Sequence, residues 1–266
     1  MPTERRIGRR SVALVLAAVL FAPGPALAYR PFDGTDADVA EAKTVEVEVA
    51  PAEVLSQEGS HAFRAPSLAL SFGLGGGYEL GLDGANVVTP HPEPGEPRMQ
   101  FIDAAVALKK LVRGGTLQEK HGPSVATEFE LEFPGRGQSH LGSELRGILS
   151  TAGPPGVVHL QAALERTPEG LNTATGGFII ESAERNGLHA AAELGIEAER
   201  AGLPTESALL ALVFVAHEGL MLDLGVDFSR SGDEHATELR AGFTRQIGAA
   251  ATERVRNWAK FHLRRR

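Results

Sequence analysis

The sequence predicts an all-β protein, an antiparallel up-and-down transmembrane β-barrel of about 12 strands. Apolar and polar residues alternate along many segments, tight turns join these segments in pairs, and longer stretches rich in Gly, Pro and charge connect the pairs. Alternation at every second residue is the pattern of a β-strand with one apolar face. Short turns at one rim and long loops at the other are typical of an outer-membrane barrel.

The expected strands follow one another with short gaps. They cover residues 43–49, 67–74, 78–88, 102–109, 125–133, 143–151, 158–165, 175–184, 188–197, 207–217, 220–228 and 236–247. The fifth is the clearest, because every second residue from Val125 to Phe133 opposes alanine or glutamate, an order that no helix accommodates. In the fourth, Ile102 and Leu108 oppose Asp103 and Lys109, whereas the faces are less distinct in the sixth and eighth.

Four tight turns define one rim of the expected barrel. They are Gly75-Gly76-Gly77, Gly153-Pro154-Pro155, Asn186-Gly187 and Glu218-Gly219. An even strand number places both ends of the barrel and these turns on the periplasmic side, so the connections after strands one, three, five and seven are expected as outer loops. Residues 113–123 are long where this topology expects a short turn, and the pattern does not explain why.

The N-terminus carries a processing signal. Residues 1–28 combine four arginines, an apolar core and the small-residue site Ala26-Leu27-Ala28. Pro23 and Pro25 favour a cleaved signal peptide over a membrane anchor, because they break a helix where a spanning segment would continue. We expect residues 29–42 to lie in the periplasm or plug the lumen, and residues 43–247 to form the outer-membrane barrel. Residues 248–266 form a basic C-terminal tail, either an amphipathic helix or a solvated extension.

Two segments resemble a known family. The stretch LVRGGTLQEKHGPSVATEFEL contains Gly122-Pro123-Ser124 at the end of a long connection, and RPFDGTDADVAEAKTVEVEV leads into the first strand. Both resemble the outer-membrane transporter family associated with the meta-pathway of phenol degradation. The resemblance implies a barrel with a transport role and does not identify a cargo.

The polar face of the strands supplies the candidate site residues. If the apolar face meets lipid, twelve charged or titratable side chains line the lumen: Asp103, Lys109, Glu128, Glu130, Glu132, His159, His189, Glu193, Glu197, Asp223, Asp227 and Arg240. Eight of these are carboxylates, so a wet lumen would concentrate cations. A packed polar interior that conducts nothing is the alternative.

Other chemistry has little support in the sequence. Asp33, Asp36 and Asp38 lack the glycine and the closing glutamate of a calcium loop, and the nine His show no metal-ligand spacing. No Ser lies in a nucleophile elbow. We expect no catalytic residue, metal, cofactor or nucleic-acid partner.

The most favoured function is an outer-membrane channel or transporter for small solutes, including hydrophobic or aromatic ones. Its expected partners are outer-membrane lipid, the barrel-assembly machinery and the solute. Two alternatives remain open at this point. One is a non-conducting structural barrel, and the other is a soluble periplasmic β-sandwich or lipocalin-like binding protein, which would also alternate.

Overall fold

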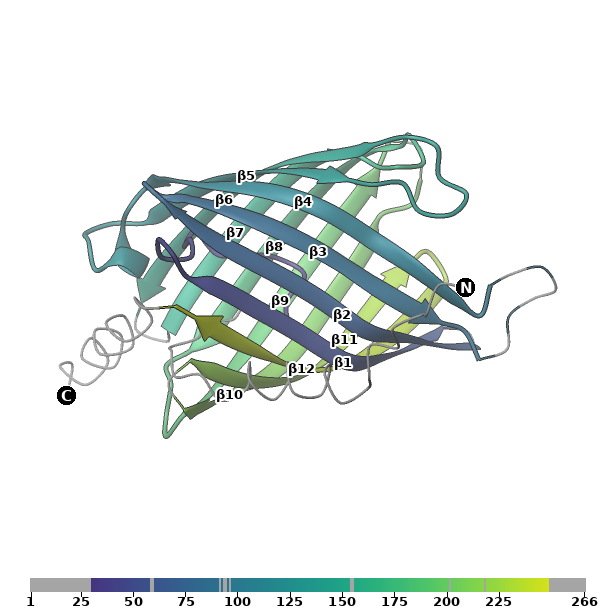
Figure 1. Cartoon of the computed structure of the whole chain (residues 1–266). Helices are drawn as coiled ribbons and strands as arrows, with labels where there is room; N and C mark the ends of the chain where they lie inside the picture. The colour runs from purple at the N-terminus through teal and green to yellow at the C-terminus, as the bar shows by residue number, and fades with distance from the viewer. Residues whose placement is uncertain are drawn as a thin grey trace, which may run out of the picture.

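The computed structural model describes residues 30–57, 60–90, 92, 95, 97–153, 156–200, 202–217 and 219–248. It is a closed barrel in which every strand pairs with its sequence neighbours and β1 pairs with β12 (Figure 1). The strands are β1 (Val45–Gln57), β2 (Ser60–Gly75), β3 (Tyr78–Val88), β4 (Met99–Arg113), β5 (Ser124–Glu132), β6 (Gly142–Gly153), β7 (Gly156–Arg166), β8 (Asn172–Ser182), β9 (Leu188–Glu199), β10 (Thr205–His217), β11 (Leu220–Ser231) and β12 (Glu234–Ile247). The predicted fold class is confirmed.

The expected tight turns lie together at one rim, here called the turn rim. β2 ends at Gly75 and β3 begins at Tyr78, and Gly76 and Gly77 between them adopt positive φ angles of 62° and 77°. The opposite end, the loop rim, carries the longer connections between β3 and β4 and between β5 and β6. Within the described residues, no helix is long and apolar enough to cross a bilayer.

The prediction of a long outer loop after the first strand is wrong. β1 continues to Gln57 and β2 begins at Ser60, so residues 50–66 are mostly strand. Pairing shifts register between Val49 and Ala52 in β1 and between Arg64 and Ser67 in β2. Each shift contains a proline, and bulges let the ladders continue past residues that cannot donate a hydrogen bond.

The prediction that Ile102 lies on the apolar outer face is also wrong. A bulge in β4 pairs Ile102 with the buried Ala85, and Asp103 within the bulge has a φ of 54°. The extra residue changes which side chains point outward. Phe101, 56% exposed, therefore takes the outward position, while Ile102 shares the inner face with Ala85.

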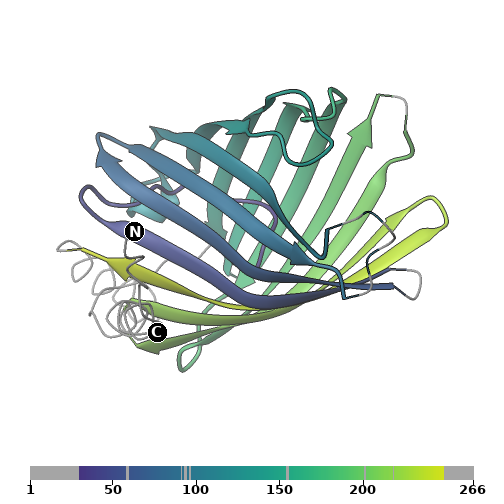
Figure 2. The same cartoon turned by 45° about the vertical axis from the view of Figure 1, so that its right-hand side comes forward.

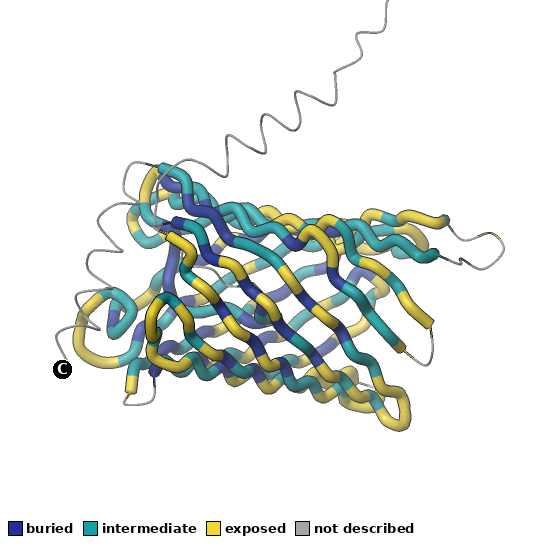
Figure 3. The backbone as a smooth tube through the Cα atoms, turned by 90° about the horizontal axis from the view of Figure 1, so that it is seen from below, coloured by how far each residue is buried: buried dark blue, intermediate teal, exposed yellow. Residues whose placement is uncertain are grey.

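Burial in this barrel is inverted relative to a soluble protein. Along β11, Leu224 is 60% exposed, whereas its neighbours Asp223 and Asp227 are 7% and 6% exposed. The same alternation of buried and exposed positions follows the strands around the barrel (Figure 3). Soluble monomers rarely expose so extensive an apolar surface, so the closed single sheet and its apolar exterior rule out the β-sandwich and disfavour the lipocalin-like alternative.

Leu224→Arg tests this assignment of faces. Leu224 lies near the middle of β11 on the outer face, so the substitution should lower the free energy of unfolding by ~2–4 kcal/mol in lipid. Thr175→Arg is the matched control, because Thr175 points inward from β8 and pairs with Glu197. Equal losses in urea titrations of the two variants would contradict the assignment.

Candidate functional site: the barrel interior

Residues 30–42, which precede β1, lie inside the barrel (Figure 2). They cross the interior as the purple segment visible between the strands in Figure 2. They make hydrogen bonds to inward-facing side chains from seven strands, β1, β3, β4, β6, β7, β9 and β12. These side chains are Glu53, Glu79, Lys109, Ser150, Gln161, Glu193 and Arg240.

Side chains of the wall satisfy the backbone of this segment. Glu193 accepts the amides of Asp33 and Gly34 at 2.9 and 3.0 Å. Ser150 accepts the amide of Ala37 at 2.8 Å. A buried N–H without a partner is costly, so these acceptors supply what a strand ladder would otherwise provide.

The segment approaches the wall too closely for a side chain at one position. A Cβ added to Gly34 would lie 1.6 Å from Nε2 of Gln161. Further along, Ala37 is fully buried against Ala126 and Ile148. The segment thus carries small residues where it meets β5, β6 and β7, and a larger side chain at position 34 would displace Gln161.

The long connection at residues 113–123 has a structural role here. It contains the short 3-10 helix η1 (Thr116–Gln118), and Leu117 packs against the cluster around Ala37. Nε2 of Gln118 donates to Asp38 at 2.8 Å. The connection is long because it folds against the segment inside the barrel.

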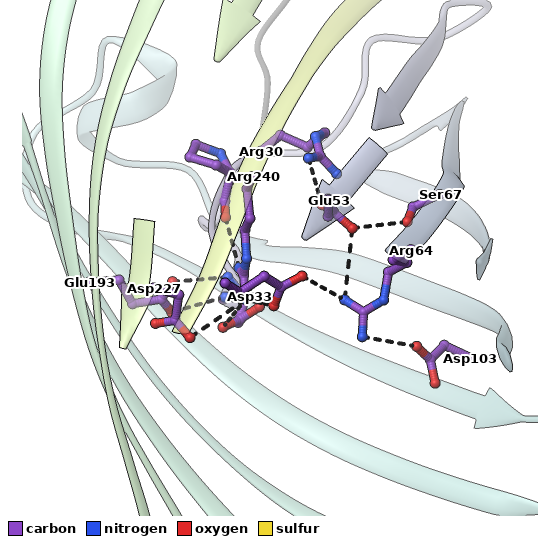
Figure 4. A network of polar contacts seen from close by, with 12 residues as sticks. Arg30, Asp33, Glu53, Arg64, Ser67, Asp103, Glu193, Asp227 and Arg240 are labelled. Carbon is purple, nitrogen blue, oxygen red and sulfur yellow. Dashed lines mark hydrogen bonds and ion pairs between the residues drawn. The ribbon is translucent and has the colours of Figure 1, made fainter. Parts of the chain in front are cut away.

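Arg240 of β12 is the cation at the centre of this arrangement (Figure 4). Its guanidinium donates to Oδ1 of Asp33 at 2.7 Å and to Glu238 at 3.1 Å, and lies 3.8 Å from Asp227. It also donates to the carbonyl oxygen of Pro31 at 3.0 Å. Burying a charge requires such pairing, and here one arginine serves both the wall and the segment.

Two further arginines hold the carboxylates of β1 and its neighbours. Arg30 of the segment donates to Glu53 at 2.8 Å. Arg64 of β2 lies 3.9 Å from Glu53, 3.5 Å from Glu238 and 3.8 Å from Asp103. Figure 4 shows Arg64 between Glu53 and Asp103.

A cavity of about 410 Å³ remains beside the segment. Asp33, Thr35 and Asp36 of the segment line one side of it. The other side carries charged side chains of the wall, among them Asp83, Asp103, Lys109, Glu128, Glu130 and Arg146. The interior therefore combines a bound peptide segment with a polar, mainly acidic space.

The twelve expected lumen residues occupy four environments. Glu193, Asp223, Asp227 and Arg240 surround the segment. Glu128 pairs in register with Lys109 and Arg146, and Asp103 and Glu130 line the cavity. Glu132 and Glu197 lie toward the loop rim, and His159 and His189 form a pair through Glu181.

One histidine of the pair lies between a serine and a glutamate, and serine hydrolases use the same succession of serine, histidine and acid. Oγ of Ser150 lies 2.8 Å from Nδ1 of His159, whose Nε2 lies 2.9 Å from Glu181. Nε2 of His189 lies 3.2 Å from the other oxygen of Glu181. Ser150 is fully buried and accepts the amide of Ala37, so its hydroxyl anchors the segment and is closed to a substrate.

Sequence reasoning missed several interior groups. They are Glu53, Arg64, Glu79, Asp83, Glu144, Arg146, Glu181 and Glu238. Strands six and eight seemed indistinct because Ile148 and Ile179 face inward and are buried. Extending the two-residue period from Thr173 would have placed Glu181 on the inner face. Within the described residues, no group of three or more His, Asp or Glu could hold a metal ion.

Comparison with known proteins finds solved β-barrels of similar fold. Neither a protein-family model nor a curated protein matches the chain. An outer-membrane channel from Pseudomonas putida F1 is 10% identical over 81% of this chain and 100% of its own, with a TM-score of 0.61. The NanC porin is 10% identical over 76% and 100%, with a TM-score of 0.55, and the KdgM porin is 13% identical over 75% and 98%, with a TM-score of 0.50.

These likenesses define the class of fold. All three structures are named as channels or porins, and none as an enzyme. At such low identity they show the fold alone, a closed β-barrel like theirs. The association with phenol degradation stays a resemblance of two segments. The expected signal peptide, Tyr29 and the tail beyond Gly248 lie outside the described residues.

Gly34→Ala tests the close approach of the segment to the wall. The added methyl group must displace Gln161 or the segment, so amides 33–40 should exchange with deuterium about tenfold faster or more. Gly147→Ala is the matched control, since an added Cβ there meets no atom within 4 Å. Unchanged protection in Gly34→Ala, measured by mass spectrometry, would show that the segment does not depend on this contact.

Proposed function

We propose that the chain is an outer-membrane channel for small solutes whose N-terminal segment narrows the lumen. The observation that carries this proposal is a cavity-containing, charged interior inside a closed barrel with an apolar exterior. Burying so many polar and charged side chains costs free energy. This cost is smaller if water and solutes enter the interior and hydrate or bind these side chains. A cleaved signal peptide, outer-membrane lipid and the barrel-assembly machinery belong to the same proposal.

The interior favours cationic solutes. Toward the loop rim, Glu144 pairs in register with Glu130 on one side and Glu165 on the other. Like charges directly opposite one another repel, and a cation between them relieves the repulsion. Hydrophobic or aromatic solutes have less support, because Asp83 and Asp103 are among the side chains that line the cavity.

The acidic character is stronger near the loop rim than near the segment. Glu128 lies 4.0 Å from Arg146 and pairs in register with Lys109. Arg146 also donates a hydrogen bond to Glu144 at 2.7 Å. Glu128 thus faces two wall cations, whereas Glu130 and Glu165 both face the carboxylate of Glu144, which accepts its hydrogen bond from Arg146.

A non-conducting barrel is the second candidate. The specific observation in its favour is the number of wall side chains that residues 30–42 engage, since the segment occupies part of the interior that a solute would have to cross. The two candidates differ in one measurable property, the ionic current through a single barrel.

Deleting residues 30–41 while retaining the processing site separates these candidates. If the segment narrows a channel, the single-channel conductance in planar bilayers should rise at least severalfold, because an interior now lined by free charged groups becomes wet. Asp33→Asn, which weakens one ion pair and leaves the segment in place, is the milder comparison. Absence of current in the wild-type protein would favour the non-conducting barrel, whether or not the deletion variant conducts.

The variant Glu130→Gln/Glu132→Gln/Glu144→Gln tests the preference for cations. Removing three carboxylates near the loop rim should lower the cation-over-anion permeability ratio about threefold to tenfold at low salt. Reversal potentials measure this ratio, and the difference should shrink at high salt as screening increases. Glu206→Gln is the control, because Glu206 is exposed and paired with Arg230. An equal change in the control would mean that the rim carboxylates do not set selectivity.

A further inference from the structure

Two buried carboxylates from different strands converge on the guanidinium of Arg30. Nη2 of Arg30 lies 2.8 Å from Oε1 of Glu53 on β1, and its Nε lies 3.6 Å from Oδ2 of Asp223 on β11. The side chains of Glu53 and Asp223 are only 4% and 1% exposed. The arginine belongs to the segment and not to the wall, so the wall carries the acceptor half of this site by itself.

A glycine forms the floor between the two carboxylates. Gly242 of β12 pairs with Asp223 of β11, and a Cβ added to it would lie 2.4 Å from Nε of Arg30. On its other side, the bulge of β1 between Val49 and Ala52 brings Glu53 onto the inner face. The absence of a side chain at Gly242 thus leaves the space that the planar group occupies.

Arg30 fills this space incompletely. Within the described part of the chain, neither carboxylate oxygen of Asp223 has a hydrogen-bond partner, and the single N–H of Arg30 Nε has none either. Glu53, by contrast, also accepts a hydrogen bond from Ser67 at 3.1 Å. A buried carboxylate without a hydrogen bond is costly, so a ligand that donates to both acids would bind better than the tethered side chain.

We propose that Glu53, Asp223 and Gly242 form a binding site for guanidinium-bearing solutes, which Arg30 occupies when no solute is present. The guanidinium group is favoured over a simple ammonium because its flat, forked donors can reach two acids on opposite sides of a shallow glycine floor. A solute that takes this site displaces Arg30 and weakens the hold of the wall on the segment. This inference rests on the proposed channel function only where it concerns transport.

Chemical rescue of Arg30→Ala tests the site without any measurement of current. In mild detergent, ethylguanidinium at several times its dissociation constant should raise the unfolding temperature of this variant by about 2–4 °C. The gel mobility of heated samples reports that temperature. N-ethylurea, a neutral analogue of similar shape, should give no shift, and ethylammonium should give less than half of it. Wild-type protein should respond weakly, because its tethered Arg30 competes at high effective concentration.

The variant Arg30→Ala/Asp223→Asn supplies the decisive control, since it keeps the shape of the site and removes one acid. The shift with ethylguanidinium should disappear there and persist in Arg30→Ala/Glu206→Gln, whose second change lies outside the site. Should Arg30→Ala fail to fold, Arg30→Lys serves in its place, because it keeps the charge and loses the fork. The proposal is overturned by no shift in the single variant, by equal shifts with all three compounds, or by a shift that survives Asp223→Asn.

Current recordings distinguish this proposal from the channel itself. If the chain is no channel, ethylguanidinium still stabilises Arg30→Ala and no variant conducts. If the channel exists and the site does not, the deletion of residues 30–41 conducts while the thermal shift is absent. If the chain is a channel and the site also exists, ethylguanidinium should increase the open time of the wild-type channel and N-ethylurea should not.

Discussion

Closure of the sheet between β1 and β12 is the constraint on which the rest of the structure depends. In hydrocarbon no water can satisfy a free N–H or C=O group, so a spanning sheet must pair its two edges. Val45 faces Ile247 and Gln57 faces Ala236 along this seam. Once the seam is closed, every second side chain must point inward, and the alternation of the sequence turns into an apolar exterior around a charged interior.

That interior creates a second requirement, which the N-terminal segment meets. Glu193 and Glu79 need donors, and the backbone amides of the segment supply them. Arg240 needs anions, and Asp33 adds to those of the wall. The segment has no ladder of its own within the described residues, so its conformation depends on these side chains as much as they depend on it.

The same exchange suggests how a closed interior could open. The wall binds the segment through its backbone amides, the guanidinium of Arg30 and the carboxylate of Asp33. A solute that carries the same groups can bind to the same wall side chains. The acids around Arg30 are the sharpest instance, because Asp223 is buried without a hydrogen bond. The carboxylates toward the loop rim would then gather cations before they meet the segment.

The sequence by itself determined the barrel, its twelve strands and the inward phase of residues such as Asp223 and Glu128, because a two-residue period with tight turns is a local property. It could not locate the bulges that moved Ile102 inward, since they depend on the partner strand. Only the tertiary structure placed Asp33 beside Arg240, more than 200 residues away in the chain, and gave residues 113–123 a reason for their length. Contacts across the interior join residues that only the three-dimensional arrangement of the strands brings together, and a local pattern does not specify which of them meet.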